Sequence, residues 1–235
     1  LVDPVSVAHF GEPTDIDGNG RAVIFFTRAV NELNPPGVDV FTAGFFWSGD
    51  LFPEEATARA EACPGGNQAE MFYMLTADPA GEAGRQFSAA EIRELTIPVI
   101  AHEYQHLINA GRRLWVNEAS AFEAVWLNEG LSHVAEELLY FAVTGLGPGA
   151  DIGYDEVTGA PGGAAAFNDY MGGNFDKYFR FLERPDTVSI LVGDNLPTRG
   201  AAWNFLRYAA DRSGRGDEAF FGDVVNGTTA GLDNL

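Results

Sequence analysis

The first third of the chain carries short apolar stretches separated by turn residues, a pattern typical of β-strands. Three stretches are rich in β-branched and aromatic residues: RAVIFFTRAV from residue 21, VDVFTAGFFW from residue 38 and EMFYMLTAD from residue 70. Such side chains pack well on a pleated surface. The pattern therefore predicts a small sheet in this part of the chain.

From Ser88 onward the apolar positions recur with helical spacing. Ser88 and Glu91 have the spacing of a capping box, which predicts the start of the helix. Pro98 predicts either a kink or the first turn of a new helix capped by Thr96. Both versions leave residues 99–110 helical.

Gly111 is expected to end this helix. A second helix is expected to run from Ser120, where Glu123 completes another capping box, to about Phe141. The glycine-rich residues 144–163 predict a long connection. Further helical stretches follow at residues 164–171, 176–184, 199–212 and 217–225.

Strands followed by helices predict an α+β fold with two lobes. We expect an N-terminal α+β lobe, residues 1–111, that ends in the helix starting at Ser88, and a mainly helical C-terminal lobe, residues 112–235. A chain of 235 residues can bury a substantial core, so these lobes together form one domain. Cys63 is the only cysteine, which excludes an intrachain disulfide.

The composition is strongly acidic. With 14 basic and 34 acidic residues the formal net charge is −20, which repels phosphate backbones and anionic membrane surfaces. We therefore expect no nucleic-acid partner. No apolar run approaches the roughly 18 residues of a membrane span, and the opening residues LVDPVSVAHF lack the features of a signal peptide. The oligomeric state stays open.

The segment HEYQH places two histidines four residues apart. On a helix, His102 and His106 point within roughly 40° of each other, one turn apart, so both imidazoles can reach one ion. Glu103 flanks that ion without having to bind it. This is the geometry of the H-E-x-x-H zinc motif, in which the ion acidifies a bound water and the glutamate takes its proton. The alternative is a helix that carries two packed histidines by chance.

A catalytic zinc ion has three protein ligands and one open position for water. Candidates for the third ligand are Glu118, Glu123, Glu129 and His133. Glu118 precedes the second helix and Glu123 is the expected cap partner, which leaves the helix interior. Gly130, next to Glu129, costs a helix about 1 kcal/mol, and we expect it to let the second helix approach the first closely. The alternative makes His133 the ligand and Glu129 a solvated residue.

His133 and Glu136 continue the helix face of Glu129, at i+4 and i+7. We expect them behind the ligands, where a carboxylate holds the second nitrogen of a ligating histidine.

The two motifs carry a family resemblance. AHEYQHLIN followed by WLNEGLSHVAEEL resembles the gluzincin group of zinc metallopeptidases and, within it, the hyicolysin family of secreted bacterial peptidases, most clearly over residues 97–140. The resemblance implies a two-lobed, zincin-like catalytic domain with one zinc ion bound by His102, His106 and Glu129. It implies Glu103 as the general base, and it implies secretion.

The implied activity is that of a zinc metalloendopeptidase acting on protein or peptide substrates. The resemblance also implies an oxyanion-stabilising tyrosine or histidine from the C-terminal lobe, where the candidates are Tyr154, Tyr170, Tyr178 and Tyr208. Two alternatives stay open: a non-catalytic protein-binding domain on a peptidase fold, and a zinc aminopeptidase. The chain has no G-x-M-E-N segment to hold a substrate amino terminus, which disfavours the aminopeptidase.

Two further segments each allow two structural interpretations. EMFYMLTAD, residues 70–78, is either the edge strand to which an extended substrate adds or an ordinary core strand. DIDGNG places Asp15, Asp17 and Asn19 as in the opening of a calcium loop, but the twelfth position, where such a loop has a bidentate acid, is Phe26. A turn leading into a strand explains DIDGNG as well.

Overall fold

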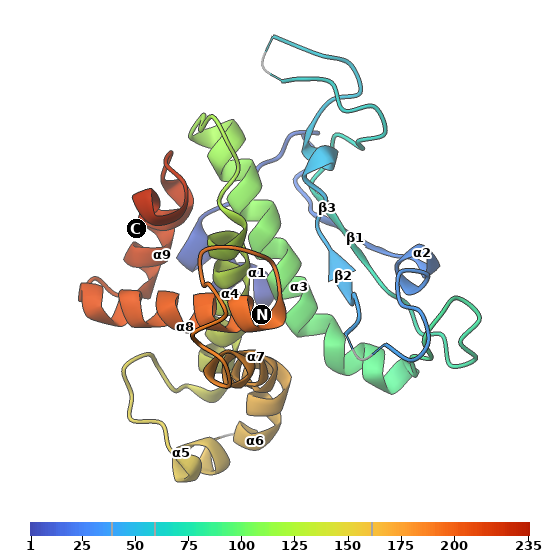
Figure 1. Ribbon diagram of the computed structural model, residues 1–235. Coiled ribbons are helices and arrows are strands. Elements are labelled where there is room, and N and C mark those ends of the chain that lie inside the picture. The colour runs from blue at the N-terminus through green and yellow to red at the C-terminus, as the bar shows by residue number, and fades with distance from the viewer. Residues whose placement is uncertain (39, 59, 161) are drawn as a thin grey trace.

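The computed structural model describes residues 1–38, 40–58, 60–160 and 162–235. Asp39, in the second predicted strand segment, and Pro161, in the predicted connection, lie outside the described residues. In Figure 1 a small sheet and the short helix α2 stand on one side of α3, and most of the other helices gather on the other side. The described strands are β1 Val23–Phe26, β2 Gly44–Phe45 and β3 Met71–Met74. The described α-helices are α1 Val2–Phe10, α2 Arg28–Asn31, α3 Ala89–Gly111, α4 Val125–Thr144, α5 Tyr154–Gly159, α6 Gly163–Ala166, α7 Gly172–Leu182, α8 Leu196–Ser213 and α9 Asp217–Asn226.

The predicted α+β fold is confirmed, with all three predicted strand segments in one sheet and in shorter form. Their order is β1-β3-β2. β1 runs parallel to β3, with Val23 opposite Met71, and β2 runs antiparallel to β3, with Gly44 opposite Met74. β3 is therefore the central strand, so the core-strand reading of residues 70–78 is confirmed and the edge-strand reading is wrong.

The start of α3 is as predicted. Ser88 Oγ accepts from the Glu91 backbone N–H, and Glu91 Oε2 accepts from the Ser88 N–H, which completes the capping box. The helix continues through Pro98 as one element. Thr96 does not cap a new helix, because its hydroxyl donates to the Ile92 carbonyl inside the same helix.

α3 ends at Gly111 as predicted, but not through a left-handed glycine cap. The Gly111 φ of −61° is right-handed, and the chain continues into a π-helical turn, Arg112–Val116. Gly111 is needed for a close approach instead, because a Cβ atom there would lie 2.6 Å from Thr14 Oγ1. The N-terminal segment thus crosses the end of α3 where a side chain would block it.

The predicted start of the second helix at Ser120 is wrong, because α4 begins at Val125. Glu123 does not act as a cap partner. Its buried carboxylate accepts from Arg113 Nη1 at 3.1 Å and from the Gly231 backbone N–H at 2.6 Å. These contacts come from distant parts of the chain, and they hold Glu123 outside the helix.

The C-terminal helical predictions are confirmed as α6 to α9, with a π-helical turn, Phe167–Met171, between α6 and α7. The predicted connection over residues 144–163 contains the short helix α5. The sequence patterns did not predict α1 or α2. α1 packs on α9, where the rings of Phe10 and Phe221 lie 6.3 Å apart.

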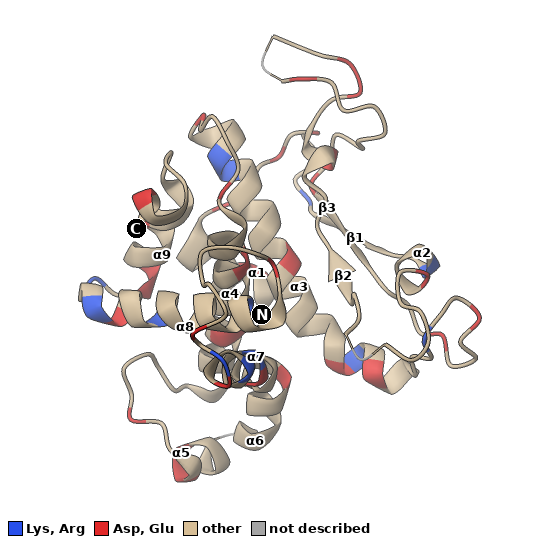
Figure 2. Cartoon of the chain, viewed as in Figure 1, with Lys and Arg blue, Asp and Glu red and all other residues tan. Residues whose placement is uncertain are grey.

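The main hydrophobic core lies between α3, α4 and α8 and also takes side chains from α1 and α9. Acidic side chains are spread over most elements, as the net charge of −20 requires (Figure 2). Among the described helices, none has the length and apolarity needed to cross a membrane.

Gly130 brings α4 close to α8, so the expectation that it brings α4 close to α3 is wrong. A Cβ atom on Gly130 would lie 2.8 Å from Leu206 Cδ1 and 3.2 Å from both the carbonyl carbon and the Cβ atom of Ala202. The leucine tip can move, but the backbone of α8 at Ala202 cannot move without shifting the helix. The glycine therefore fixes the separation of α4 and α8.

We predict that Gly130→Ala destabilises the protein by about 1–3 kcal/mol, because overpacking against α8 outweighs the better helix propensity of alanine. The matched control is Gly222→Ala in α9, where the added Cβ atom would meet only the His9 carbonyl oxygen at an ordinary 3.6 Å. This control should be neutral or stabilising by up to about 1 kcal/mol. Urea unfolding of both variants tests the difference, and equal effects would contradict the packing account.

Candidate metal centre

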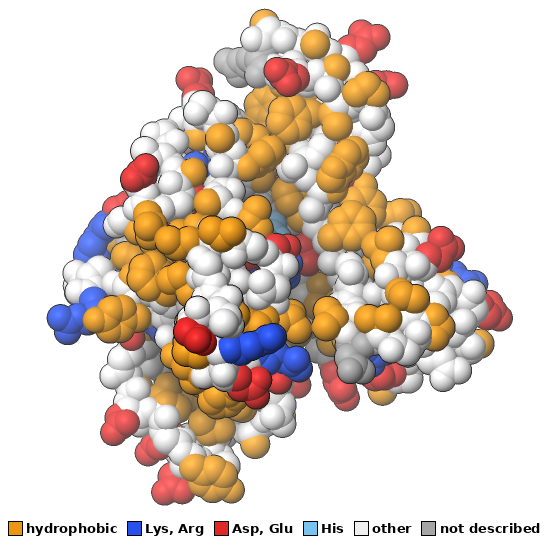
Figure 3. All heavy atoms as spheres, viewed as in Figure 1, with side chains coloured by type: hydrophobic (Ala, Val, Ile, Leu, Met, Phe, Trp, Pro, Cys, Tyr) orange, Lys and Arg blue, Asp and Glu red, His pale blue; other side chains and the backbone are white. Residues whose placement is uncertain are grey.

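Two helices bring the H-E-x-x-H histidines and a glutamate to one point. His102 and His106 extend from α3 and are buried, each 8 % exposed. Glu129 extends from α4, with its side chain 12 % exposed. Its Oε2 atom lies 3.4 Å from His102 Nε2, and its Oε1 atom lies 3.6 Å from His106 Nε2. Figure 3 shows a hollow between the helices and the sheet, with histidine and acidic side chains at its floor.

These distances suit a metal ion better than hydrogen bonds. Hydrogen bonds of this kind measure about 2.7–3.2 Å between heavy atoms. Two ligand atoms of a tetrahedral zinc ion, each about 2.0–2.2 Å from the metal, lie about 3.3–3.6 Å apart. The residues present therefore fit a zinc ion bound by His102, His106 and Glu129.

A second group of potential ligands shares one of these histidines but has hydrogen-bond geometry. Glu136 Oε1 lies 2.8 Å from His102 Nδ1 and 3.1 Å from His133 Nδ1. Both distances are too short for neighbouring ligands on one zinc ion. Glu136 therefore occupies the expected place behind a ligating histidine. His133 contacts Glu136, and it is absent from the group that holds both H-E-x-x-H imidazoles.

Polar side chains from α4 contact both imidazoles. Glu136 accepts from Nδ1–H of His102, which leaves a lone pair on Nε2. Ser132 Oγ donates to Gln105 Oε1 at 2.7 Å and lies 3.0 Å from Nδ1 and 3.3 Å from Nε2 of His106, so it contacts this ring without selecting one nitrogen. The contact from Glu136 thus orients His102, and Ser132 links the His106 ring to Gln105 of the same helix.

Sequence reasoning missed the roles of Ser132 and Gln105. A signal was present for Ser132, because it stands three residues after Glu129 and so shares its helix face. Gln105 gave no such signal. Its contact with Ser132 depends on the packing of α4 against α3.

The charges around the two histidines differ. Burial lowers the pKa of His106 to about 4. Burial opposes protonation of His102 too, but contacts with Glu129 and Glu136 outweigh it and raise that pKa to about 10. The two imidazoles in turn hold the pKa of Glu129 below its usual range despite burial. The surroundings thus stabilise a positive charge at His102, which a bound divalent cation would supply in place of the proton.

Glu103 lies beside this group and is also buried, at 6 % exposed. Its Oε2 atom accepts from the Phe46 backbone N–H at 2.8 Å, which ties α3 to the residue after β2. Burial raises the pKa of Glu103 to about 7, a value suited to taking and giving protons at neutral pH. Gly44 permits this approach, because a Cβ atom there would lie 2.9 Å from Val99 Cγ1 and 2.8 Å from the Tyr73 carbonyl oxygen.

Arg199 in the first turn of α8 is a further site residue that the sequence did not predict. Its Nη1 atom lies 2.9 Å from Glu129 Oε2, and its Nε atom donates to Asp194 at 2.6 Å. Among the described hydrogen bonds and ion pairs, Arg199 reaches Glu129 and none of the expected tyrosines does. Tyr154 and Tyr208 are mostly exposed, and the other two candidates, Tyr170 and Tyr178, pack against the main core.

The chain is distantly related to a metalloprotease. No family model matches the chain. The neutral metalloprotease ShpI of Staphylococcus hyicus is 28 % identical to it over 137 residues, which make up 58 % of this chain and 28 % of that protein. The chain therefore spans well under a third of the length of the relative it matches. This similarity supports a metallopeptidase relationship and a metal in the site.

We predict that Glu136→Gln lowers the affinity for zinc about 10–100-fold, because the hydrogen bond to His102 Nδ1 loses its charged acceptor. Competition with a zinc-binding dye measures this effect. The matched control is the neighbouring Glu137→Gln. Burial raises the pKa of Glu137 to about 8, so its carboxyl is already mostly neutral at pH 7, and its contacts are with Trp203 and Arg207. Equal zinc affinities in both variants would contradict the proposed orienting role of Glu136.

Proposed function

We propose that this chain is a zinc-dependent metalloendopeptidase with His102, His106 and Glu129 as zinc ligands and Glu103 as general base. The observation that carries the proposal is the spacing of the three ligand groups, at 3.4 and 3.6 Å between their atoms. Two imidazoles and one carboxylate are a donor set typical of catalytic zinc. The distant relationship to a metalloprotease supports the same activity.

Glu103 carries the proton transfer in this mechanism. A bound zinc ion supplies the Lewis acidity that makes water nucleophilic at neutral pH. The Oε2 atom of Glu103 is held by the Phe46 N–H, so Oε1 is the atom that takes the proton of the attacking water. Glu103 then passes this proton to the leaving nitrogen of the cleaved peptide. Its pKa of about 7 suits both steps.

The edge strand β2 is the place where we propose that substrate binds. Within the described sheet, β2 pairs only with β3, so its other edge is free to add a strand. Phe46 follows β2 directly and contacts Glu103. An extended peptide on this edge therefore lies next to the general base. β2 thus replaces residues 70–78 as the proposed edge strand to which the substrate adds.

We also propose a family, a location and a division into lobes for this chain. The H-E-x-x-H pair with a glutamate from the next long helix supports assignment to the gluzincin group and the hyicolysin family, and through them secretion. The division into lobes at residue 111, together forming one catalytic domain, is proposed on the same resemblance.

The decisive experiment compares Glu103→Gln with Glu94→Gln, an exposed glutamate on the same helix. Purified variants are tested for bound zinc and for casein cleavage. We expect Glu103→Gln to keep its zinc and to lose about 10²- to 10⁴-fold in cleavage rate, because it cannot accept the proton. Glu94→Gln should keep both zinc and activity.

The same assay separates the alternatives. Zinc bound by the unaltered protein without any cleavage of casein would favour a non-catalytic binding domain. Cleavage confined to the ends of short peptides would favour an aminopeptidase. Full activity of Glu103→Gln would overturn the assignment of the general base.

A further inference from the structure

Outside the candidate metal centre, a buried glutamate has an oxygen atom without a hydrogen-bond partner in the described part of the chain. Glu70 stands directly before β3 and is 1 % exposed. Its Oε1 atom accepts from the Ile16 backbone N–H at 2.9 Å. Its Oε2 atom is buried and has no hydrogen bond in the described part of the chain. Such an atom is costly to bury, which points to a ligand that supplies the missing contact.

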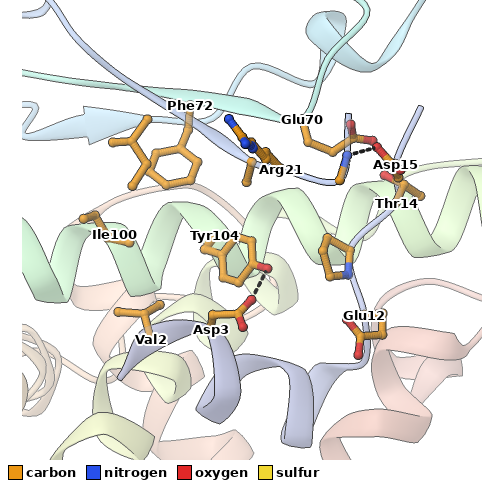
Figure 4. Close-up of a pocket in the computed structure, with 14 residues that line it drawn as sticks. Val2, Asp3, Glu12, Thr14, Asp15, Arg21, Glu70, Phe72, Ile100 and Tyr104 are labelled. Atoms are coloured by element: carbon orange, nitrogen blue, oxygen red, sulfur yellow. Dashed lines mark hydrogen bonds between the residues drawn. The ribbon is translucent and has the colours of Figure 1, made fainter. Parts of the chain in front are cut away.

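Two exposed aspartates converge on this glutamate. One carboxylate oxygen from each of Asp15, Asp17 and Glu70 lies within 4.8 Å of the other two. Oxygen ligands on opposite sides of one calcium ion lie about 5 Å apart, so these three fit around a single ion. Figure 4 shows the carboxylates of Asp15 and Glu70 side by side at one end of a pocket, with the Arg21 guanidinium turned toward Phe72.

No basic residue in the described part of the chain forms an ion pair with these three carboxylates. Among the described ion pairs, none joins a lysine or an arginine to any of the three carboxylates. Three carboxylates this close repel one another unless a cation lies between them. All three potential ligands are oxygen atoms, the donors that calcium prefers, and no histidine or cysteine belongs to the group.

The loop around the aspartates is folded as a calcium loop requires. The Gly20 N–H donates to Asp15 Oδ1 at 2.9 Å, and the Asn19 N–H donates to Asp17 Oδ1 at 3.0 Å. If Asp15 is position 1 of the loop, Gly20 is position 6. Its φ of +67° makes the sharp turn that a calcium loop has at this position.

The sheet replaces the acid that the loop lacks at its twelfth place. Phe26 at that place lies in β1, opposite Met74 of β3. The same pairing places Glu70 beside the loop, because the Val23 N–H donates to the Glu70 backbone carbonyl at 2.7 Å. Glu70, which is distant in sequence, thus takes the place of the acid that a calcium loop has at its twelfth position.

We propose that Asp15, Asp17 and Glu70 bind a calcium ion. This ion ties the N-terminal segment to the start of β3 and thereby holds the sheet next to α3. Tyr104 and Ile100 of α3 line the same pocket (Figure 4). The site shares no residue with the proposed zinc ligands, so this proposal does not depend on the proposed peptidase activity.

The test measures calcium-dependent stability in the full chain. All proteins carry Glu103→Gln, so self-cleavage cannot affect the result; they are freed of divalent ions, reloaded with zinc and titrated with CaCl₂. We expect the melting temperature of this parent to rise by about 5–10 °C at a calcium concentration 100-fold above Kd. Adding Glu70→Gln or Asp17→Asn should abolish the rise, and adding the exposed Asp186→Asn should leave it intact.

Calorimetric titration with CaCl₂ should show one binding site in the parent and in the Asp186→Asn control. An unchanged melting temperature in the parent, or an equal rise in Glu70→Gln and Asp17→Asn, would overturn the proposal. An equal response to MgCl₂ would overturn the assignment to calcium. If Glu70→Gln fails to fold, the exposed Asp17→Asn decides alone, because its side chain supports no buried contact.

Discussion

The structure depends on burying the carboxylate of Glu129 among groups that compensate its charge. His102 and His106 approach it from α3, and Arg199 approaches it from α8. The cost of burying a carboxylate is high unless it is paired, so all three helices must meet at this one side chain. Gly130, the next residue, allows this meeting because only a glycine lets α8 pack so closely on α4. The helix propensity lost at that glycine is offset by the contact it makes possible.

The sequence predicted the parts of the site that depend on local spacing. His102, Glu103 and His106 follow from one helical motif, and Glu129 and Glu136 follow from the periodicity of a second helix. The start of that helix was predicted wrongly, since two of the residues that hold Glu123 outside it, Gly231 and Asn234, are far from it in the sequence. Arg199 was missed for the same reason: its position depends on how α8 packs, and no local pattern records that. Local periodicity thus finds candidate ligands on helices, whereas the partners that packing contributes become visible only in the fold.

The sheet shows the same division between local and distant information. Each strand was recognisable from its β-branched and aromatic residues, but strand order depends on pairings between distant segments. β3 lies in the middle of the sheet, and the two-residue strand β2 becomes the edge next to Glu103 through the contact at Phe46. Strand pairing also places Glu70 beside the loop of Asp15. A search of the twelve residues of a calcium-loop pattern cannot find this neighbour, because Glu70 is distant in sequence. The order of the strands therefore determines the surroundings of both candidate cation sites.

The two sites share one physical signature and differ in their donors. In each, a largely buried glutamate carboxylate lies beside two further potential ligands, Glu129 beside two imidazoles and Glu70 beside two aspartates. Around Glu129 the neighbours are imidazole nitrogen atoms, held at spacings that fit a small tetrahedral ion. Around Glu70 they are exposed carboxylates, which leave room for water and for the larger coordination sphere of calcium. A nitrogen-rich, closely spaced set of ligands favours zinc, and an oxygen-only, open set favours calcium, so the two proposed sites differ in the ion that their donors select.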